Sequence, residues 1–239
     1  MAFIVPKRKN GPKAHLPVAL LIDKSASAED IRPILNTCVE KLIKTLRQDT
    51  ALRGIVELYV AFFSNTYEVV ADFEPIETIR LEQLYLSDCH GFTETGRALL
   101  EVLQRLDEKK IEWKRKSEKY YQPLVFLLTD GYPDAGKGAP SEMVKRVRQD
   151  YQMAAQQIRA REKAEKIVFL AAGIEQVNGV SADMAKLREL TIYPERIVKV
   201  CESNEICKIE RFFNLIYEST NATFNNTPVG EIIREVLLI

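Results

Sequence analysis

The chain has 239 residues, 46% of them hydrophobic, and its 34 Lys and Arg balance 34 Asp and Glu to a formal net charge of +0. This length suits one large domain, or one domain with an extension, and is enough to bury a sizeable core. The balanced charge gives no support for general nucleic-acid or membrane-surface binding, and no apolar run approaches the ~18 residues of a membrane span.

The four cysteines indicate a reducing environment. They are few and scattered, show no zinc-like spacing, and lie at Cys38, Cys89, Cys201 and Cys207. The first residues contain no apolar stretch typical of a signal peptide. We therefore expect a soluble, cytoplasmic protein.

Apolar runs of strand length alternate along the chain with segments of helical spacing. The predicted strands are 17–22, 55–63, 67–73, 123–129, 167–172 and 197–200. The predicted helices lie around 31–46, 81–86, 99–106, 141–163, 182–190 and 206–217. Runs 55–63 and 67–73 are separated by a short polar turn and predict a hairpin. The pattern predicts an α/β fold, a three-layer α/β/α sandwich whose mostly parallel central sheet has one antiparallel edge strand.

The ends of the chain differ in character from its middle. We expect an N-terminal lead-in over 1–14, one domain over 15–220 and a C-terminal extension over 221–239. Segment 108–119 is strongly charged and predicts a protruding helical end. Trp113 with its basic and tyrosine neighbours allows a basic-aromatic contact patch, but a solvated helix end is the favoured interpretation.

Three loops that follow or adjoin the predicted strands carry oxygen donors. The first holds Asp23, Ser25 and Ser27, the second holds Thr93 or Thr95, and the third holds Asp130, with Asp134 as a further candidate; these are the candidate donors. Asp23 and Asp130 both end buried strands, so a parallel sheet brings them to the same edge. Two carboxylates and three hydroxyls suit a hard cation such as Mg²⁺ or Mn²⁺.

Each loop also has an ordinary structural interpretation. Asp followed by Ser commonly caps a helix, Asp-Gly commonly forms a turn, and Thr93 or Thr95 could cap the next helix. For each loop considered alone, the ordinary structural interpretation is favoured over a metal site. Capping does not require three loops to converge, however, so the combination favours a metal site.

The same residues resemble a known family. Asp23-Lys-Ser-Ala-Ser27 matches the DxSxS motif of von Willebrand factor A (VWA) domains. Gly91 to Leu99 resembles their G-x-T-x-x-G-x-A-L loop, and Leu127 to Gly131 resembles their third, Asp-Gly loop. Within the family, Leu16-Pro-Val18 and the run Leu124 to Pro133 are most similar to TerY-like proteins, small bacterial cytoplasmic members associated with tellurite resistance and stress response.

The resemblance implies a metal-ion-dependent adhesion site (MIDAS) rather than catalysis. It implies metal contact through Ser25, Ser27 and Thr93, with Asp23 and Asp130 binding directly or through water. Mg²⁺ is the implied cofactor, with Mn²⁺ or Ca²⁺ as alternatives. A carboxylate of a protein partner would complete the metal shell, and a kinase or phosphatase of the same stress or defence module is the kind of partner implied.

Departures from the family pattern leave two other functions open. Lys24 stands where small or neutral residues are frequent, and Ala26 and Ala28 replace a frequent Gly and Met. In a metal-free scaffold, the Lys24 ammonium would replace the cation. A metal-dependent phosphoester hydrolase could use the same carboxylates, but the sequence offers no general base beside them and no activated nucleophile. We therefore expect a binding module and not an enzyme.

Overall fold

A seven-stranded sheet forms the centre of the molecule. The computed structural model describes residues 14–129, 133–175, 182–201 and 206–232. The strands are β1 (Ala14–Asp23), β2 (Val56–Phe63), β3 (Tyr67–Pro75), β4 (Lys119–Tyr120), β5 (Leu124–Thr129), β6 (Val168–Glu175) and β7 (Ile197–Cys201). Their order is β3-β2-β1-β5-β6-β7, and β4 pairs with the first residues of β1. Among the strands that the structure describes, only the β2–β3 pair is antiparallel, as the predicted hairpin requires.

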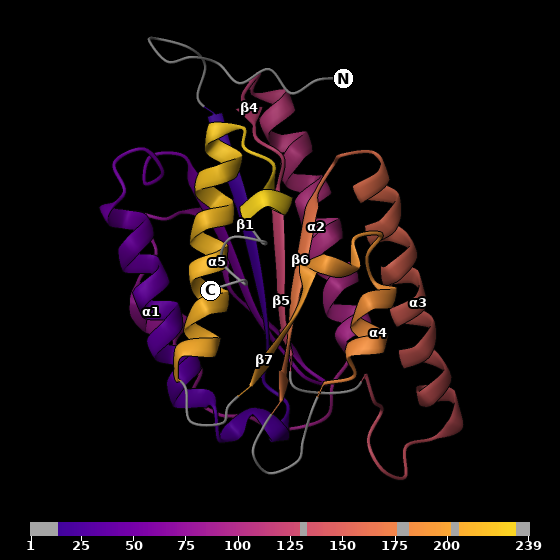
Figure 1. Cartoon of the computed structure of the whole chain (residues 1–239). Coiled ribbons are helices and arrows are strands. Elements are labelled where there is room, and N and C mark those ends of the chain that lie inside the picture. Colours follow the sequence, from indigo (N-terminus) through magenta and orange to yellow (C-terminus); the bar gives the residue numbers. More distant parts are fainter. Residues whose placement is uncertain (1–13, 130–132, 176–181, 202–205, 233–239) are drawn as a thin grey trace.

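Helices cover both faces of this sheet (Figure 1). They are α1 (Arg32–Gln48), α2 (Thr95–Arg115), α3 (Ser141–Lys163), α4 (Met184–Glu189) and α5 (Ile206–Asn225). Short 3₁₀ turns occupy Ala26–Glu29, Leu81–Leu84 and Pro194–Arg196. Helices α1 and α5 lie on one face, and α2, α3 and α4 lie on the other. The predicted three-layer sandwich is therefore confirmed.

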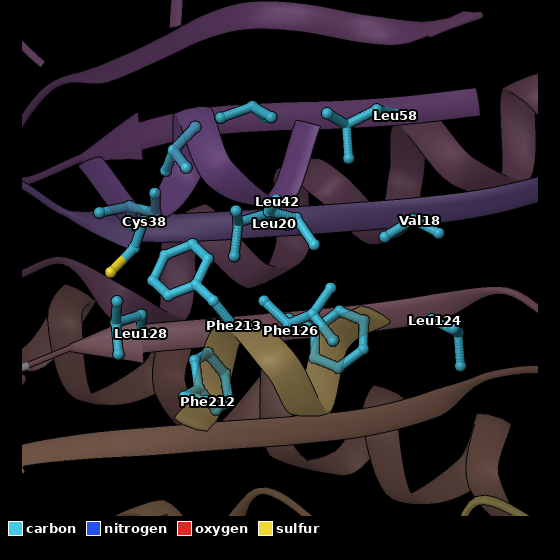
Figure 2. Packing of buried hydrophobic residues seen from close by; sticks show 14 of the residues in the cluster. Val18, Leu20, Cys38, Leu42, Leu58, Leu124, Phe126, Leu128, Phe212 and Phe213 are labelled. Carbon is cyan, nitrogen blue, oxygen red and sulfur yellow. The ribbon is translucent and has the colours of Figure 1, made fainter. Parts of the chain in front are cut away.

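The central strands are apolar along their whole length because both of their faces are buried. Val18 and Leu20 of β1 belong to the core shared with α1 and α5, where Val18 is opposite Leu124 and Leu20 is opposite Phe126 of β5 (Figure 2). Leu21 of the same strand belongs to the second core, beneath α2 and α3. Alternation of side chains along each strand thus divides one apolar run between two cores.

The charged segment 108–119 differs from its predicted structure. Trp113 is only 2% exposed, and its ring stacks on that of His15 with the centroids 4.8 Å apart. His15 Nδ1 lies 2.5 Å from Glu57 Oε1, and His15 Nε2 lies 3.1 Å from Glu118 Oε2. Trp113 therefore belongs neither to a contact patch nor to a solvated helix end. Burial of its large aromatic ring is favourable enough to outweigh the preference of the charged neighbouring residues for solvent.

Helix α5 extends beyond its predicted end near residue 217. Polar residues follow this predicted end, and they continue the helix to Asn225, into the segment 221–239 that was expected to form a C-terminal extension. Thr220 Oγ1 donates to the carbonyl oxygen of Ile216 at 2.7 Å, and Thr223 Oγ1 donates to that of Ser219 at 2.9 Å. These bonds to the preceding turn satisfy buried hydroxyls within a helix, so polar composition alone did not end it.

Among the described residues, no helix combines the length and apolar character needed to span a bilayer.

Candidate metal centre

Asp23 is the last residue of β1 and lies at the carboxyl-terminal edge of the sheet. Its side chain is buried, with 2% of the residue exposed. The backbone N–H of Ser25 donates to Asp23 Oδ1 at 2.8 Å, and Thr129 Oγ1 donates to Asp23 Oδ2 at 2.5 Å. Because β1 and β5 are parallel neighbours, with Ile22 opposite Leu128, their ends place Asp23 and Thr129 side by side.

Burial destabilises the charged form of the Asp23 carboxyl group. Desolvation raises its pKa above the ordinary value of 3.8, and hydrogen bonds from Thr129, Ser25 and Thr93 only partly oppose this shift. Among the described residues, hydroxyl and amide groups are what offset the desolvation of this carboxylate, so a cation bound beside it would lower its pKa further.

Two serine hydroxyls lie on the turn that follows Asp23. Ser25 is buried, Ser27 is half-buried, and their Oγ atoms are 3.1 Å apart. Ser25 has extended backbone geometry (φ −62°, ψ 163°) and precedes the 3₁₀ turn. Ser27 lies within that turn, which brings the two hydroxyls together, and the Ser25 side chain does not make the cap hydrogen bond that the ordinary interpretation suggested.

The second loop is held against the first by backbone hydrogen bonds. His90 N–H donates to the carbonyl oxygen of Lys24 at 2.8 Å, and Ala26 N–H donates to that of Gly91 at 3.2 Å. Thr93 is buried in this loop, and its hydroxyl contributes to lowering the pKa of the Asp23 carboxyl. These backbone hydrogen bonds therefore fix the second loop relative to the first.

The third loop contacts the second. Asp134 N–H donates to the carbonyl oxygen of Thr93 at 3.0 Å, while Asp134 Oδ1 accepts from Ala135 N–H at 2.7 Å. Asp130 lies outside the described residues, and the preceding residue is Thr129, whose hydroxyl contacts Asp23. Asp23, Ser25, Ser27 and Thr93 thus lie close together, while their binding of a metal, and the part of Asp130 in it, stay predictions.

Two glycines allow the second loop its close approaches. Gly91 has a φ of +82°, and a Cβ there would lie 1.8 Å from Asn65 Oδ1. Gly96, in the first turn of α2, lies so close to α3 that a Cβ would be 2.3 Å from the backbone nitrogen of Tyr151. Only glycine permits both approaches.

Thr95 differs from Thr93 in its surroundings. It is fully buried in the first turn of α2, and its hydroxyl has no hydrogen-bond partner among the described residues. The neighbouring Glu94 points elsewhere, because its Oε1 accepts from Arg146 of α3 at 2.6 Å.

The Lys24 side chain is directed to the edge hairpin. Its Nζ lies 2.8 Å from Glu68 Oε2 of β3, and the side chain is only 7% exposed. The ammonium of this unusual motif residue therefore has a carboxylate partner that is not one of the candidate metal ligands.

Thr129 is a site residue that the sequence analysis missed. Its hydroxyl makes one of the shortest contacts with Asp23, and it also ends a buried strand. The signal was present in the order Leu-Thr-Asp-Gly, because the residue before Asp130 is in register with the end of β1.

These donors fit a hard cation and not a soft one. Among the described residues, no cluster of three or more His, Cys, Asp or Glu could hold a metal. A cation bound here would instead rely on one buried carboxylate and hydroxyl oxygens, which suits Mg²⁺ or Mn²⁺ better than a thiolate- or imidazole-seeking metal.

Fold and site together define an open α/β domain whose hydroxyl-bearing loops meet beside a buried carboxylate at the carboxyl ends of parallel strands. The sequence model of the von Willebrand factor type A domain matches residues 18–212, so the chain belongs to this family. No sequence of a curated protein matches the chain significantly.

Solved structures agree in fold at low sequence identity. Proximal thread matrix protein 1 of the mussel byssus is 19% identical with a TM-score of 0.57, covering 86% of this chain and 48% of its own. Another structure of that protein has zinc in its MIDAS motif. Manganese-loaded TRAP of Plasmodium vivax is 19% identical with a TM-score of 0.51, covering 85% of this chain and 75% of its own. The chain thus spans about half the length of the mussel protein.

Proposed function

We propose that this VWA domain is a metal-dependent protein-interaction module. Asp23, Ser25, Ser27, Thr93 and Asp130 would hold one Mg²⁺, with Mn²⁺ as a substitute, and a carboxylate of a partner protein would complete its shell. When bound, the ion supplies a positive charge that attracts the partner's carboxylate. The observation that carries the proposal is the convergence of three hydroxyls on the buried Asp23 carboxylate.

The same residues favour binding over hydrolysis. The chain has two histidines, and among the described residues neither contacts the Asp23 carboxylate. His15 lies at the start of β1, opposite the candidate site, and His90 Nδ1 contacts Asp88 Oδ2 at 2.8 Å. Among the described residues, no histidine is positioned to take a proton from metal-bound water, which disfavours general-base catalysis. We therefore propose that the protein is not an enzyme.

The cellular setting is part of the proposal. The similarity of Leu16-Pro-Val18 and of the run Leu124 to Pro133 to TerY-like proteins supports a role in the bacterial cytoplasm, within a stress-response or defence system related to tellurite resistance. A kinase or phosphatase of the same system is the proposed partner, and its binding should be lost when EDTA removes the metal.

A pair of threonine variants tests the metal site. Thr93→Val should weaken Mn²⁺ binding by about tenfold or more, because it removes an oxygen ligand. Thr95→Val makes the same chemical change two residues away, where the buried hydroxyl has no partner among the described residues. It should leave Mn²⁺ affinity unchanged and stabilise the protein slightly, since an unsatisfied polar group is removed.

Isothermal titration calorimetry with Mn²⁺ measures both variants, with thermal unfolding as the check on folding. Equal affinities for the two variants would contradict the assignment of Thr93. Failure of the wild-type protein to bind either Mn²⁺ or Mg²⁺ at millimolar concentration would contradict the proposed function itself.

Variants of Lys24 and its partner distinguish a metal site from a metal-free scaffold. Because its ammonium is bound by Glu68, Lys24→Met should change Mg²⁺ affinity by less than about threefold. Glu68→Gln should weaken Mg²⁺ binding more, since it releases a largely buried ammonium towards the Asp23 carboxylate. If Lys24 itself replaces the cation, Lys24→Met will instead create or strongly enhance Mg²⁺ binding in the same titration.

A further inference from the structure

A cavity lies at the end of the sheet opposite Asp23. It has a volume of about 540 Å³, within the range of small-molecule sites. Ala14 at the start of β1, Tyr120 of β4 and Val168 at the start of β6 belong to its lining. At ~3.3 Å per residue, the length of β1 separates this cavity from Asp23 by roughly 30 Å. Figure 1 shows the starts of β1 and β4 far from the loops of the metal centre.

The cavity wall offers a guanidinium with unused donors. Arg196 lines the cavity, and its guanidinium carbon lies 3.9 Å from the ring centroid of Tyr193. Its Nη1 contacts Glu162 Oε1 at 3.4 Å, but neither Nε nor Nη2 has an acceptor among the described residues. The side chain keeps 14% of its surface exposed. Arg196 is therefore held in place and can still donate to a carboxylate.

Glu162 does not use up this donor capacity. Its oxygens accept from the hydroxyl of Thr191 at 2.7 and 2.9 Å and from the backbone N–H of Ile192 at 2.9 Å. Burial raises the pKa of Glu162, although these hydrogen bonds and Arg196 oppose the shift. Since Glu162 is satisfied mainly by Thr191 and Ile192, its 3.4 Å contact with Arg196 is a weak one.

Besides Glu162, the cavity lining presents two further carboxylates. Glu165 and Glu195 belong to its lining, both are exposed, and neither has an ion-pair partner among the described residues. The lining thus holds three carboxylates against two cations, Arg196 and Lys119, which disfavours a simple anion and suits a ligand with an ammonium group. Opposite charges on one wall thus match a ligand that carries both.

Apolar and aromatic side chains form the rest of the wall. Tyr121 is 9% exposed, Ile167 is 1% exposed and Val229 is 6% exposed, and all three line the cavity. Tyr120 and Tyr193 add partly exposed rings. A ligand with a ring or another compact apolar group would bury it against these surfaces.

We propose that this cavity binds a small zwitterion of the amino-acid class with an aromatic side chain. Its carboxylate would contact Arg196, its ammonium would contact Glu165 or Glu195, and its ring would lie among the tyrosines. This site is independent of the proposed metal-dependent function, because no candidate metal ligand lines it.

Titrations of the full-length protein with three probes test the proposal. L-phenylalanine should bind saturably, whereas phenethylamine, which lacks the carboxylate, and 3-phenylpropanoate, which lacks the amine, should each bind about tenfold more weakly. Isothermal calorimetry or ligand-observed NMR measures all three. Absence of saturable binding of L-phenylalanine up to ~10 mM, or equal binding of the three probes, would overturn the proposal.

Variants assign the contacts. Arg196→Gln should weaken binding of L-phenylalanine and 3-phenylpropanoate. The double variant that combines Glu165→Gln and Glu195→Gln should weaken binding of L-phenylalanine and phenethylamine. Glu142→Gln, an exposed residue of α3 outside the cavity lining, is the matched control. If Arg196→Gln does not fold, the double glutamate variant decides, and its equality with the control overturns the proposal. Asp23→Asn should bind L-phenylalanine normally, which separates this test from that of the metal centre.

Discussion

Asp23→Asn is expected to abolish divalent-metal binding and at the same time to stabilise the metal-free protein. Asn keeps an oxygen that can accept the N–H of Ser25, and its amide can donate to the hydroxyl of Thr129, so the hydrogen-bond geometry survives. The substitution removes a buried negative charge whose desolvation raises its pKa. We expect a gain on the order of 1 kcal/mol in the free energy of unfolding without metal, and a loss of about 100-fold or more in Mg²⁺ affinity.

The pH dependence fixes the sign of this effect. Folding raises the pKa of Asp23 above 3.8, so the folded state binds its proton more tightly than the unfolded state does. That contribution to stability is fully present below pH 3.8 and is lost as the pH rises through the folded-state pKa. The advantage of Asp23→Asn should therefore be present at pH 7 and should shrink as the pH falls towards 3.8.

Metal reverses the order of the two proteins. At a free Mg²⁺ concentration 100 times its dissociation constant, the wild-type protein gains about 2.7 kcal/mol by mass action, whereas the variant gains nothing. Urea unfolding at pH 7, with EDTA and then with Mg²⁺, measures both states. If Asp23→Asn is less stable than the wild-type protein in EDTA, or responds equally to Mg²⁺, the account of Asp23 is wrong.

Thr129→Val provides the opposite change at the same contact. It keeps the Asp23 charge but removes the hydroxyl that donates to Asp23 Oδ2, so the carboxylate is left less well satisfied. The metal-free protein should lose about 1–3 kcal/mol of stability. Opposite signs for Asp23→Asn and Thr129→Val in EDTA distinguish the cost of the buried charge from a general disturbance of the loop.

Much of the fold follows from periodicity in the sequence. The continuous apolar runs 17–22 and 123–129 predicted central strands, because such runs need cover on both faces, and β1 and β5 occupy the middle of the sheet. The order of strands and helices then predicted the parallel topology and placed Asp23 at a loop-bearing edge. Local pattern and global fold agree in these segments.

The errors arose where tertiary contacts override composition. Trp113 lies in a charged segment, but its partner His15 is 98 positions away, and no local pattern indicates that stacking. The extension of α5 depends on hydroxyls such as those of Thr220 and Thr223 bonding within the helix, which composition alone does not show.

The sequence indicated which residues could form the candidate site, through their chemistry and their places at strand ends. It did not indicate the contacts that hold those residues in position. Oxygen donors at strand ends identified Asp23 and Thr93. The ion pair of Lys24 with Glu68 could not be foreseen, because it depends on how the β2–β3 hairpin passes the first loop. Sequence reasoning therefore found the residues that would touch a metal more readily than those that hold them in place.

Gly96→Ala is expected to be the most destabilising of the substitutions considered for the site. The added Cβ would lie 2.3 Å from the nitrogen and 2.6 Å from the Cα of Tyr151, and 2.5 Å from the carbonyl carbon of Asp150. All three atoms are backbone atoms of α3, so no side chain can move aside and the two helices must separate. This strain exceeds the ~1 kcal/mol by which Ala favours a helix over Gly. We expect a net loss of about 2–3 kcal/mol in the free energy of unfolding.

The same displacement should reach the metal centre, because α2 begins two residues after Thr93. A shift of its first turn would move the Thr93 hydroxyl away from Asp23, so Mn²⁺ affinity should fall by about tenfold even under conditions where the variant is folded. Gly54→Ala is the matched control, since a Cβ at Gly54 would meet no atom within 4 Å. It should change stability by less than about 0.5 kcal/mol and leave Mn²⁺ affinity unchanged. Urea unfolding and Mn²⁺ titration of both variants decide the matter, because equal results would mean that the close packing of α2 on α3 does not position the second loop.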